Sequence, residues 1–121
     1  AGYPAAADPH LTMALQERAA RHNHPYSCGL VLTRDAFYGG VATPSMPDYQ
    51  VMSQANVLAV EMECAALFII GQLRAVRTAA ILAADGNVLV GPEDMDSYKP
   101  HREIVNQAVE AAITIALQAF K

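Results

Sequence analysis

The chain has 121 residues, of which 53% are hydrophobic and 17% charged, and its formal net charge is −4. Its eight Lys and Arg residues are scattered, so no basic stripe is available for phosphate backbones and we expect no nucleic-acid partner. The longest apolar run, residues 64–70, is far shorter than the roughly 20 residues of a membrane span. We therefore expect a soluble, cytoplasmic protein without membrane contact.

The charged fraction is low, because a soluble domain typically carries about 25% charged residues. An unusual share of the surface is therefore expected to be buried against other protein. The sequence begins at Ala1 and not at an initiator Met, which indicates a processed or truncated piece of a longer protein.

The first part of the chain predicts a helix followed by a buried strand. Asp8 is a residue type that caps helices and Pro9 suits the first helical position, so a helix is expected over residues 9–22. A short apolar run bounded by turn residues predicts a strand over 26–32. A loop rich in glycine and proline then leads to a short helix over 48–56.

The second part continues this alternation. An extended apolar run at 57–60 leads to a helix over 64–75, which is apolar on nearly all sides and is expected to be buried. Small and β-branched residues without alternation predict a strand covered on both faces over 77–84. The strand ends at the turn Asp85-Gly86-Asn87, and a long helix over 101–120 closes the sequence.

Helices that alternate with continuously apolar strands predict an α/β fold around a buried sheet. Three strands alone would leave hydrophobic edges unpaired. We therefore expect that further strands of the sheet lie outside this sequence.

The cysteines and histidines do not predict a metal site. Cys28 and Cys64 lack CxxC spacing and lie in segments predicted to be buried, so we expect free core thiols in a reducing compartment. The four His residues are not spaced as metal ligands, and no bound metal is expected.

Acidic residues end one apolar run and begin the buried helix at Glu61-Met62-Glu63. A carboxylate there must accept hydrogen bonds to be tolerated, and two vicinal sugar hydroxyls are suitable donors. The alternative is that both Glu side chains simply favour the positive end of the helix.

Asp85 directly follows the predicted strand over 77–84, and ligands of open α/β sheets gather at such strand ends. Partial burial there would favour its protonated form and let it donate a proton. An ordinary Asp-Gly turn is the alternative. Phe37 and Tyr38 also follow a predicted strand, and they could stack on a planar ring or plug the edge of the core.

With these residues in view, the sequence resembles the nucleoside phosphorylase family, which includes hexameric purine nucleoside phosphorylases and uridine phosphorylases. Three stretches occur in the order and at about the spacing of that family: Asp35-Ala36-Phe37-Tyr38, Val60-Glu61-Met62-Glu63-Cys64-Ala65 and Ala80-Ile81-Leu82-Ala83-Ala84-Asp85-Gly86. The resemblance implies a three-layer α/β/α fold with a mixed central sheet. Residues 1–121 would form the C-terminal portion of that single domain.

The resemblance also implies roles for individual residues. Glu63 would accept hydrogen bonds from the ribose hydroxyls, Met62 would pack on the sugar, and Glu61 would set their loop. Phe37 or Tyr38 would flank the base. In purine-specific relatives, the residue matching Asp85 protonates the purine ring while phosphate attacks the sugar.

The sequence departs from the family at two places. Enteric uridine phosphorylases clamp uracil with a Gln and an Arg, whereas this chain has Val41 and Thr43 there. The absent clamp and the presence of Asp85 favour a purine base, but the branch of the family that this chain resembles also includes enzymes named uridine phosphorylases. The family's glycine-rich phosphate loop and its arginines belong to an N-terminal half that this sequence lacks. A further arginine or histidine that the family borrows from a neighbouring subunit is also missing. We therefore expect no phosphorolysis by this chain alone.

The predicted function is phosphorolysis of a purine nucleoside or uridine to free base and ribose 1-phosphate. Inorganic phosphate would be the co-substrate, no cofactor is expected, and the family implies a homo-oligomer, a dimer or a hexamer. One alternative is a nucleosidase, but those relatives usually carry Asp-Met-Glu-Gly where this chain has Glu61-Met62-Glu63-Cys64. The other alternative is a truncated, non-catalytic nucleoside-binding module.

Overall fold

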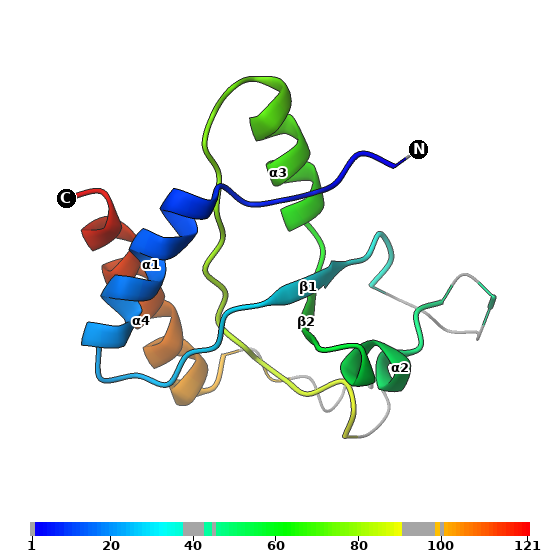
Figure 1. Cartoon of the computed structure of the whole chain (residues 1–121). Coiled ribbons are helices and arrows are strands. Elements are labelled where there is room, and N and C mark those ends of the chain that lie inside the picture. Colours follow the sequence, from blue (N-terminus) through cyan, green and yellow to red (C-terminus); the bar gives the residue numbers. More distant parts are fainter. Residues whose placement is uncertain (1, 38–42, 45, 91–98, 100) are drawn as a thin grey trace.

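The computed structural model describes residues 2–37, 43–44, 46–90, 99 and 101–121. Within them, four helices accompany a two-stranded sheet, as Figure 1 shows. In chain order the elements are α1 (Pro9–Arg21), β1 (Leu30–Thr33), α2 (Tyr49–Gln54), β2 (Val57–Glu61), α3 (Cys64–Leu73) and α4 (Glu103–Ala119). Helices with a small parallel sheet are consistent with the predicted α/β class.

The start of α1 follows the capping rules that predicted it. The Asp8 carboxylate accepts a hydrogen bond from the Leu11 N–H at 2.8 Å, and Pro9 occupies the first turn, where a missing N–H costs nothing. The Asp8 N–H donates to the carbonyl of Thr78 at 2.7 Å. The cap of α1 is thereby tied to the segment that follows α3.

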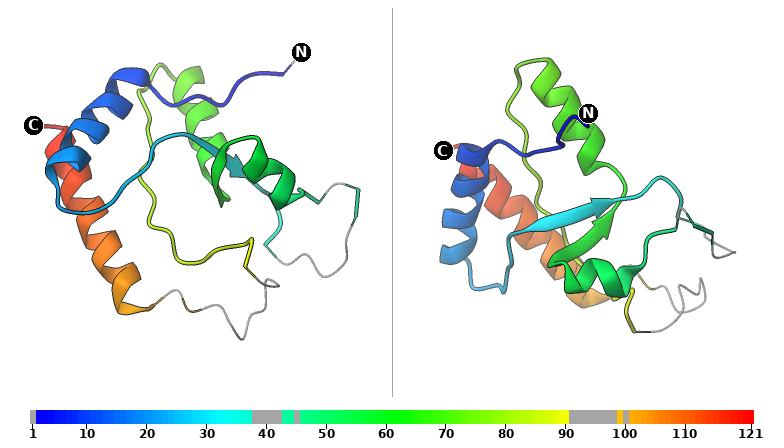
Figure 2. Two further views of the ribbon diagram at one scale, coloured as in Figure 1. Left: turned by 60° about the horizontal axis from the view of Figure 1, so that its bottom comes forward. Right: turned by 45° about the vertical axis from the view of Figure 1, so that its right-hand side comes forward.

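Helices α1 and α4 lie side by side in Figures 1 and 2, although nearly the whole chain separates them in sequence. Ala19 of α1 and three residues of α4, Val105, Ala111 and Ile115, are buried. Ala111 and Ile115 are four residues apart, about one helical turn, and so lie on one face of α4. Small alanines on both helices allow this close approach.

Strands β1 and β2 are parallel, and their register places Thr33 opposite Glu61. The connection between them passes through α2, as a parallel pair requires a crossover. Both strands therefore end at the same edge of the sheet.

The strand expected over residues 77–84 does not form. The segment has no regular secondary structure and runs from the far end of α3 toward the opposite side of the molecule (Figure 1). A strand is defined by ladder hydrogen bonds to a neighbour, and the sheet of the described residues contains only β1 and β2. The prediction was wrong for this chain because apolar sequence alone cannot supply the neighbouring strand.

The expected burial of α3 is also only partly correct. Cys64, Phe68 and Gly71 are buried, but Ile70 and Leu73 are 58% and 69% exposed. Cys28, predicted to be a core thiol, is exposed because it precedes β1. The chain exposes 9134 Å², whereas a compact protein of its mass would expose about 6,300 Å².

Helix α3 ends in a hydrogen-bonded turn that normally contains glycine. The Val76 N–H donates to the Gly71 carbonyl at 2.8 Å and the Ala75 N–H to the Gln72 carbonyl at 3.2 Å, as in a Schellman motif. Ala75 has a φ of 54°, in the left-handed region where a Cβ is strained. The helix end therefore carries a local strain that its sequence does not relieve.

Replacing Ala75 by glycine tests this strain. We expect Ala75→Gly to raise the free energy of unfolding by about 1 kcal/mol, because the unfavourable Cβ contact disappears. The matched variant Ala66→Gly, in the helical part of α3, is expected to lower it by roughly 0.5–1 kcal/mol. Urea denaturation measures both changes, and equal destabilisation by the two variants would contradict the assignment.

Candidate functional site

The carboxyl ends of β1 and β2 form the candidate site, because loops carrying polar and aromatic residues leave the sheet there. Thr33 pairs with Glu61 in the ladder, and the Arg34 N–H donates to the Glu61 carbonyl at 2.9 Å. This bond extends the pairing one residue beyond β1. In parallel sheets, ligands bind outside such strand ends.

The carboxylate of Glu61 organises the chain between β2 and α3. Its Oε1 accepts a hydrogen bond from the Thr33 hydroxyl, and its Oε2 accepts from the N–H groups of Glu63 and Cys64, each at 2.6 Å. The Thr33 oxygen in turn accepts from the Ala65 N–H at 3.0 Å. Three N–H groups at the start of α3 are thereby satisfied by side chains of the two strands.

Glu61 thus acts as a helix cap from outside the usual capping position. The N-cap residue itself is Glu63, whose side chain makes no capping bond. A carboxylate at this end also interacts favourably with the positive pole of the helix. The short turn through Met62 and Glu63 is consequently held at both ends.

The hydrogen bonds of Glu61 determine its ionisation. Burial acts to raise its pKa, but the hydrogen bonds from Thr33 and from the N–H groups of Cys64 and Glu63 together outweigh burial, so the pKa lies below its ordinary value. The Cys64 thiol behaves in the opposite way. Burial, a hydrogen bond to Glu61 and the nearby negative charges raise the pKa of Cys64 to about 12, so it remains protonated at neutral pH and is a poor nucleophile.

Met62 and Glu63 have the exposure that ligand contact requires. Met62 is half-buried and Glu63 is exposed. The Glu63 carboxylate makes no hydrogen bond within the described residues, although its N–H is bound to Glu61. The position of Glu63 is therefore fixed through its backbone, while both of its carboxylate oxygens remain available to accept hydrogen bonds.

Residues 35–38, called the aromatic loop after Phe37 and Tyr38, follow β1 in the sequence. Phe37 is 40% exposed, and its carbonyl accepts a hydrogen bond from Nη2 of Arg34 at 3.2 Å. Tyr38 lies outside the described residues. Arg34 is only 8% exposed and was not singled out from the sequence, although a charged residue directly after an apolar strand was a signal that could have identified it.

Asp85 is not brought to this edge in the described chain. It is half-buried, and its carbonyl accepts a hydrogen bond from Nη2 of Arg102 at 2.8 Å, next to the start of α4. The yellow segment around residue 85 lies apart from the start of α3 in all views of Figures 1 and 2. Glu61 thus ends β2 and Glu63 lies just after it, and Phe37 is linked to the neighbouring end of β1 through Arg34. The roles of these residues and of Asp85 stay predictions.

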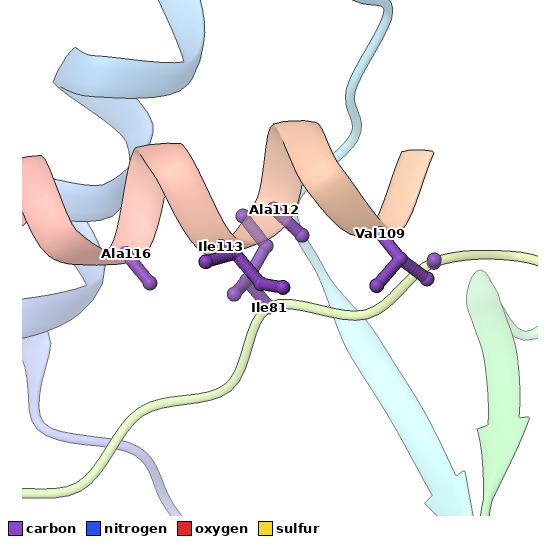
Figure 3. Close-up of a pocket in the computed structure, with 6 residues that line it drawn as sticks. Ile81, Val109, Ala112, Ile113 and Ala116 are labelled. Atoms are coloured by element: carbon purple, nitrogen blue, oxygen red, sulfur yellow. The ribbon is translucent and has the colours of Figure 1, made fainter. Parts of the chain in front are cut away.

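A separate apolar groove lies between the 77–84 segment and α4 (Figure 3). Its volume is about 230 Å³, and its lining consists of Ile81, Ala83, Val109, Ala112, Ile113 and Ala116. No polar side chain lines it to orient a ligand, as a small-molecule site requires. The groove is better explained as an apolar packing surface.

The described residues contain no group of three or more His, Cys, Asp and Glu side chains that could hold a metal ion. None of their helices combines the length and the apolar character needed to cross a membrane.

The ionisation of Glu61 leads to a pH-dependent stability. Because the folded pKa is lowered, ionised Glu61 stabilises the fold above its ordinary pKa of 4.5, and this contribution is lost as the pH falls through the lower folded value. We expect Glu61→Gln to lower the free energy of unfolding at pH 7 on the order of 1 kcal/mol, with a smaller difference from wild type at pH 3. Urea denaturation at both pH values measures the two differences.

The control is Glu110→Gln, because Glu110 lies in α4 and is exposed. This variant should change stability little at either pH. A Glu61→Gln effect that was equal at pH 7 and pH 3 would contradict a role for the ionised carboxylate.

Comparison with known proteins places the chain in a family. Its sequence matches the family model described as the phosphorylase superfamily over residues 1–121. It is 33% identical to a uridine phosphorylase from Treponema pallidum, over 98% of this chain and 46% of that protein. It is 36% identical to a purine nucleoside phosphorylase from Plasmodium falciparum, over 97% of this chain and 45% of that protein.

A guanosine phosphorylase from Halorubrum lacusprofundi is 32% identical, over 97% of this chain and 47% of that protein. The chain therefore spans somewhat less than half the length of these curated relatives. The family match over residues 1–121 and these identities show that the chain belongs to the phosphorylase superfamily, as its resemblance to the nucleoside phosphorylases indicates.

Proposed function

We propose that the protein containing this chain is a nucleoside phosphorylase. It would cleave the N-glycosidic bond of a purine nucleoside or uridine with inorganic phosphate, giving free base and ribose 1-phosphate. The observation that carries this proposal is that the Glu61 carboxylate binds the N–H groups of Glu63 and Cys64, which fixes the backbone of Glu63 while its own carboxylate stays exposed. The names of the relatives, uridine, purine nucleoside and guanosine phosphorylase, support the same reaction.

In this proposal the turn after β2 binds the sugar. The Glu63 carboxylate accepts hydrogen bonds from two vicinal ribose hydroxyls, for which an acceptor-only group with two oxygens is well suited. Met62 packs against the sugar ring. Glu61 acts indirectly, because its oxygens are already bound to Thr33 and to the start of α3.

The base would lie against the loop after β1. Phe37 has an exposed ring that can stack on a planar base, and Tyr38 is proposed to share this role. Asp85 is proposed to donate the proton to the leaving base. Since the 77–84 segment has no neighbouring strand among the described residues, we propose that further strands of the sheet bring Asp85 to the base.

The chain is proposed to be the C-terminal portion of a single three-layer α/β/α domain with a mixed sheet. Two observations support this: the relatives are about twice as long, and the chain exposes about 2,800 Å² more than a compact protein of its mass. Stable interfaces bury roughly 1,200–2,000 Å² in total, so the excess is large enough for extensive packing. The phosphate site would belong to the remaining portion.

We further propose a cytoplasmic homo-oligomer, a dimer or a hexamer, without a cofactor. Exposed apolar side chains support association, among them Leu73 of α3, Leu117 of α4 and Phe120 directly after α4. The free thiols Cys28 and Cys64 fit a reducing compartment. Light scattering of the complete protein tests the assembly, and a monodisperse monomer would contradict it.

The reaction is tested with the complete protein that contains residues 1–121. Release of hypoxanthine from inosine and of uracil from uridine should depend on added phosphate and should yield ribose 1-phosphate. Glu63→Gln should lower kcat/KM by about 10- to 100-fold, because hydrogen bonds from the hydroxyls to a charged acceptor are weakened. Base release that proceeds equally without phosphate would instead indicate a nucleosidase, and binding of inosine without turnover would indicate a non-catalytic module.

Asp85→Asn in the same assay tests the proposed acid. A general acid contributes typically about 10²- to 10⁴-fold, so inosine cleavage should fall within this range. Glu110→Gln, on the exposed surface of α4, serves as the matched carboxylate control and should retain wild-type rates. Wild-type activity of Asp85→Asn on both nucleosides would remove Asp85 from the mechanism.

A further inference from the structure

Arg34 is a buried cation at the point where the aromatic loop leaves the sheet. It is 8% exposed and directly follows β1. Moving a charged side chain out of water is costly unless its donors are bound. The groups that Arg34 contacts therefore indicate what its burial accomplishes.

The guanidinium joins two parts of the chain. Nη1 donates to the hydroxyl of Tyr49, the first residue of α2, and Nη2 donates to the carbonyl of Phe37 at 3.2 Å. The guanidinium carbon also lies 5.7 Å from the centre of the Tyr49 ring, which is within the range of a cation–π interaction. One side chain thus connects the end of β1, the backbone at Phe37 and the start of α2.

Helix α2 is itself held at its start by a cap and at its end by the connection to β2. The Asp48 carboxylate caps it by accepting from the Val51 N–H at 3.1 Å, and α2 leads directly into β2. A planar guanidinium can bind Tyr49 and Phe37 at once through separate nitrogens, which a lysine ammonium on its flexible stem does less well. Arg34 consequently fixes the backbone of Phe37 relative to α2.

We propose that Arg34, held by Tyr49, is a positioning residue that sets the place of Phe37 and thereby the affinity for the base. Arg34 touches neither base nor sugar in this proposal, which rests on the proposed nucleoside phosphorylase function. The sugar-binding turn is held separately by Glu61. Glu61 and Arg34 act at the same edge of the sheet but through different partners. A change at Arg34 should therefore alter binding of the base without altering binding of the sugar.

Calorimetry with the complete protein tests the separation by using a free base and ribose 1-phosphate as independent probes. Tyr49→Phe retains the ring and removes only the hydroxyl that accepts from Arg34. We expect it to weaken binding of the preferred base, hypoxanthine or uracil, about three- to tenfold, as loss of a hydrogen bond to a charged group predicts. Binding of ribose 1-phosphate should remain within about twofold of wild type, by the same principle.

Two further variants complete the experiment. Arg34→Lys should weaken base binding at least as much as Tyr49→Phe, with the sugar phosphate again little affected. Tyr26→Phe is the matched control, because Tyr26 is 51% exposed and precedes β1, and it should leave both affinities unchanged.

The outcomes are distinct. If the wild type binds both probes and Tyr49→Phe weakens neither, or weakens both equally, Arg34 has no selective role in placing the base and the inference is overturned. If the wild type binds neither probe, the proposed function itself fails and the inference fails with it. Selective loss of base affinity in both variants supports the proposal.

Discussion

The Glu61 carboxylate accepts hydrogen bonds from Thr33 and from the first N–H groups of α3, and the geometry of the candidate site depends on these bonds. They join the ends of two parallel strands to the start of a helix whose own N-cap residue, Glu63, makes no side-chain capping bond. A carboxylate suits this place because it satisfies several donors and faces the positive end of the helix. The same bonds favour its ionised form. Burial, a hydrogen bond to Glu61 and the nearby negative charges keep the neighbouring Cys64 protonated.

Under the proposed function, this arrangement separates the residues that hold the site in place from those that contact the ligand. Glu61 and Arg34 are committed to hydrogen bonds with the protein, whereas Glu63 and Phe37 keep exposed groups at the same edge. Groups that orient a substrate must be held rigidly by others that do not touch it. The sequence motif contains both kinds of residue side by side, and only their hydrogen bonds distinguish them.

Local sequence signals predicted most of the helices well. Asp8 and Pro9 predicted the start of α1, and the long apolar pattern near the C-terminus predicted α4 within two residues at its start. The short strand before Glu61 was also correctly expected, and the resemblance to nucleoside phosphorylases is confirmed by the family match. These features depend on contacts within one turn or on an ordered motif, which neighbouring residues specify.

The sequence by itself determined the helices, the Glu61-Met62-Glu63 motif and the family, because each is encoded by residues close together in the chain. The tertiary structure decided which residues Thr33 and Arg34 bind at the candidate site, since their partners Glu61 and Tyr49 lie 28 and 15 residues away. It also decided that the apolar 77–84 segment remains unpaired, because a strand exists only where another strand accepts its hydrogen bonds. Pairing is a property of two segments, and the sequence of one segment does not determine it.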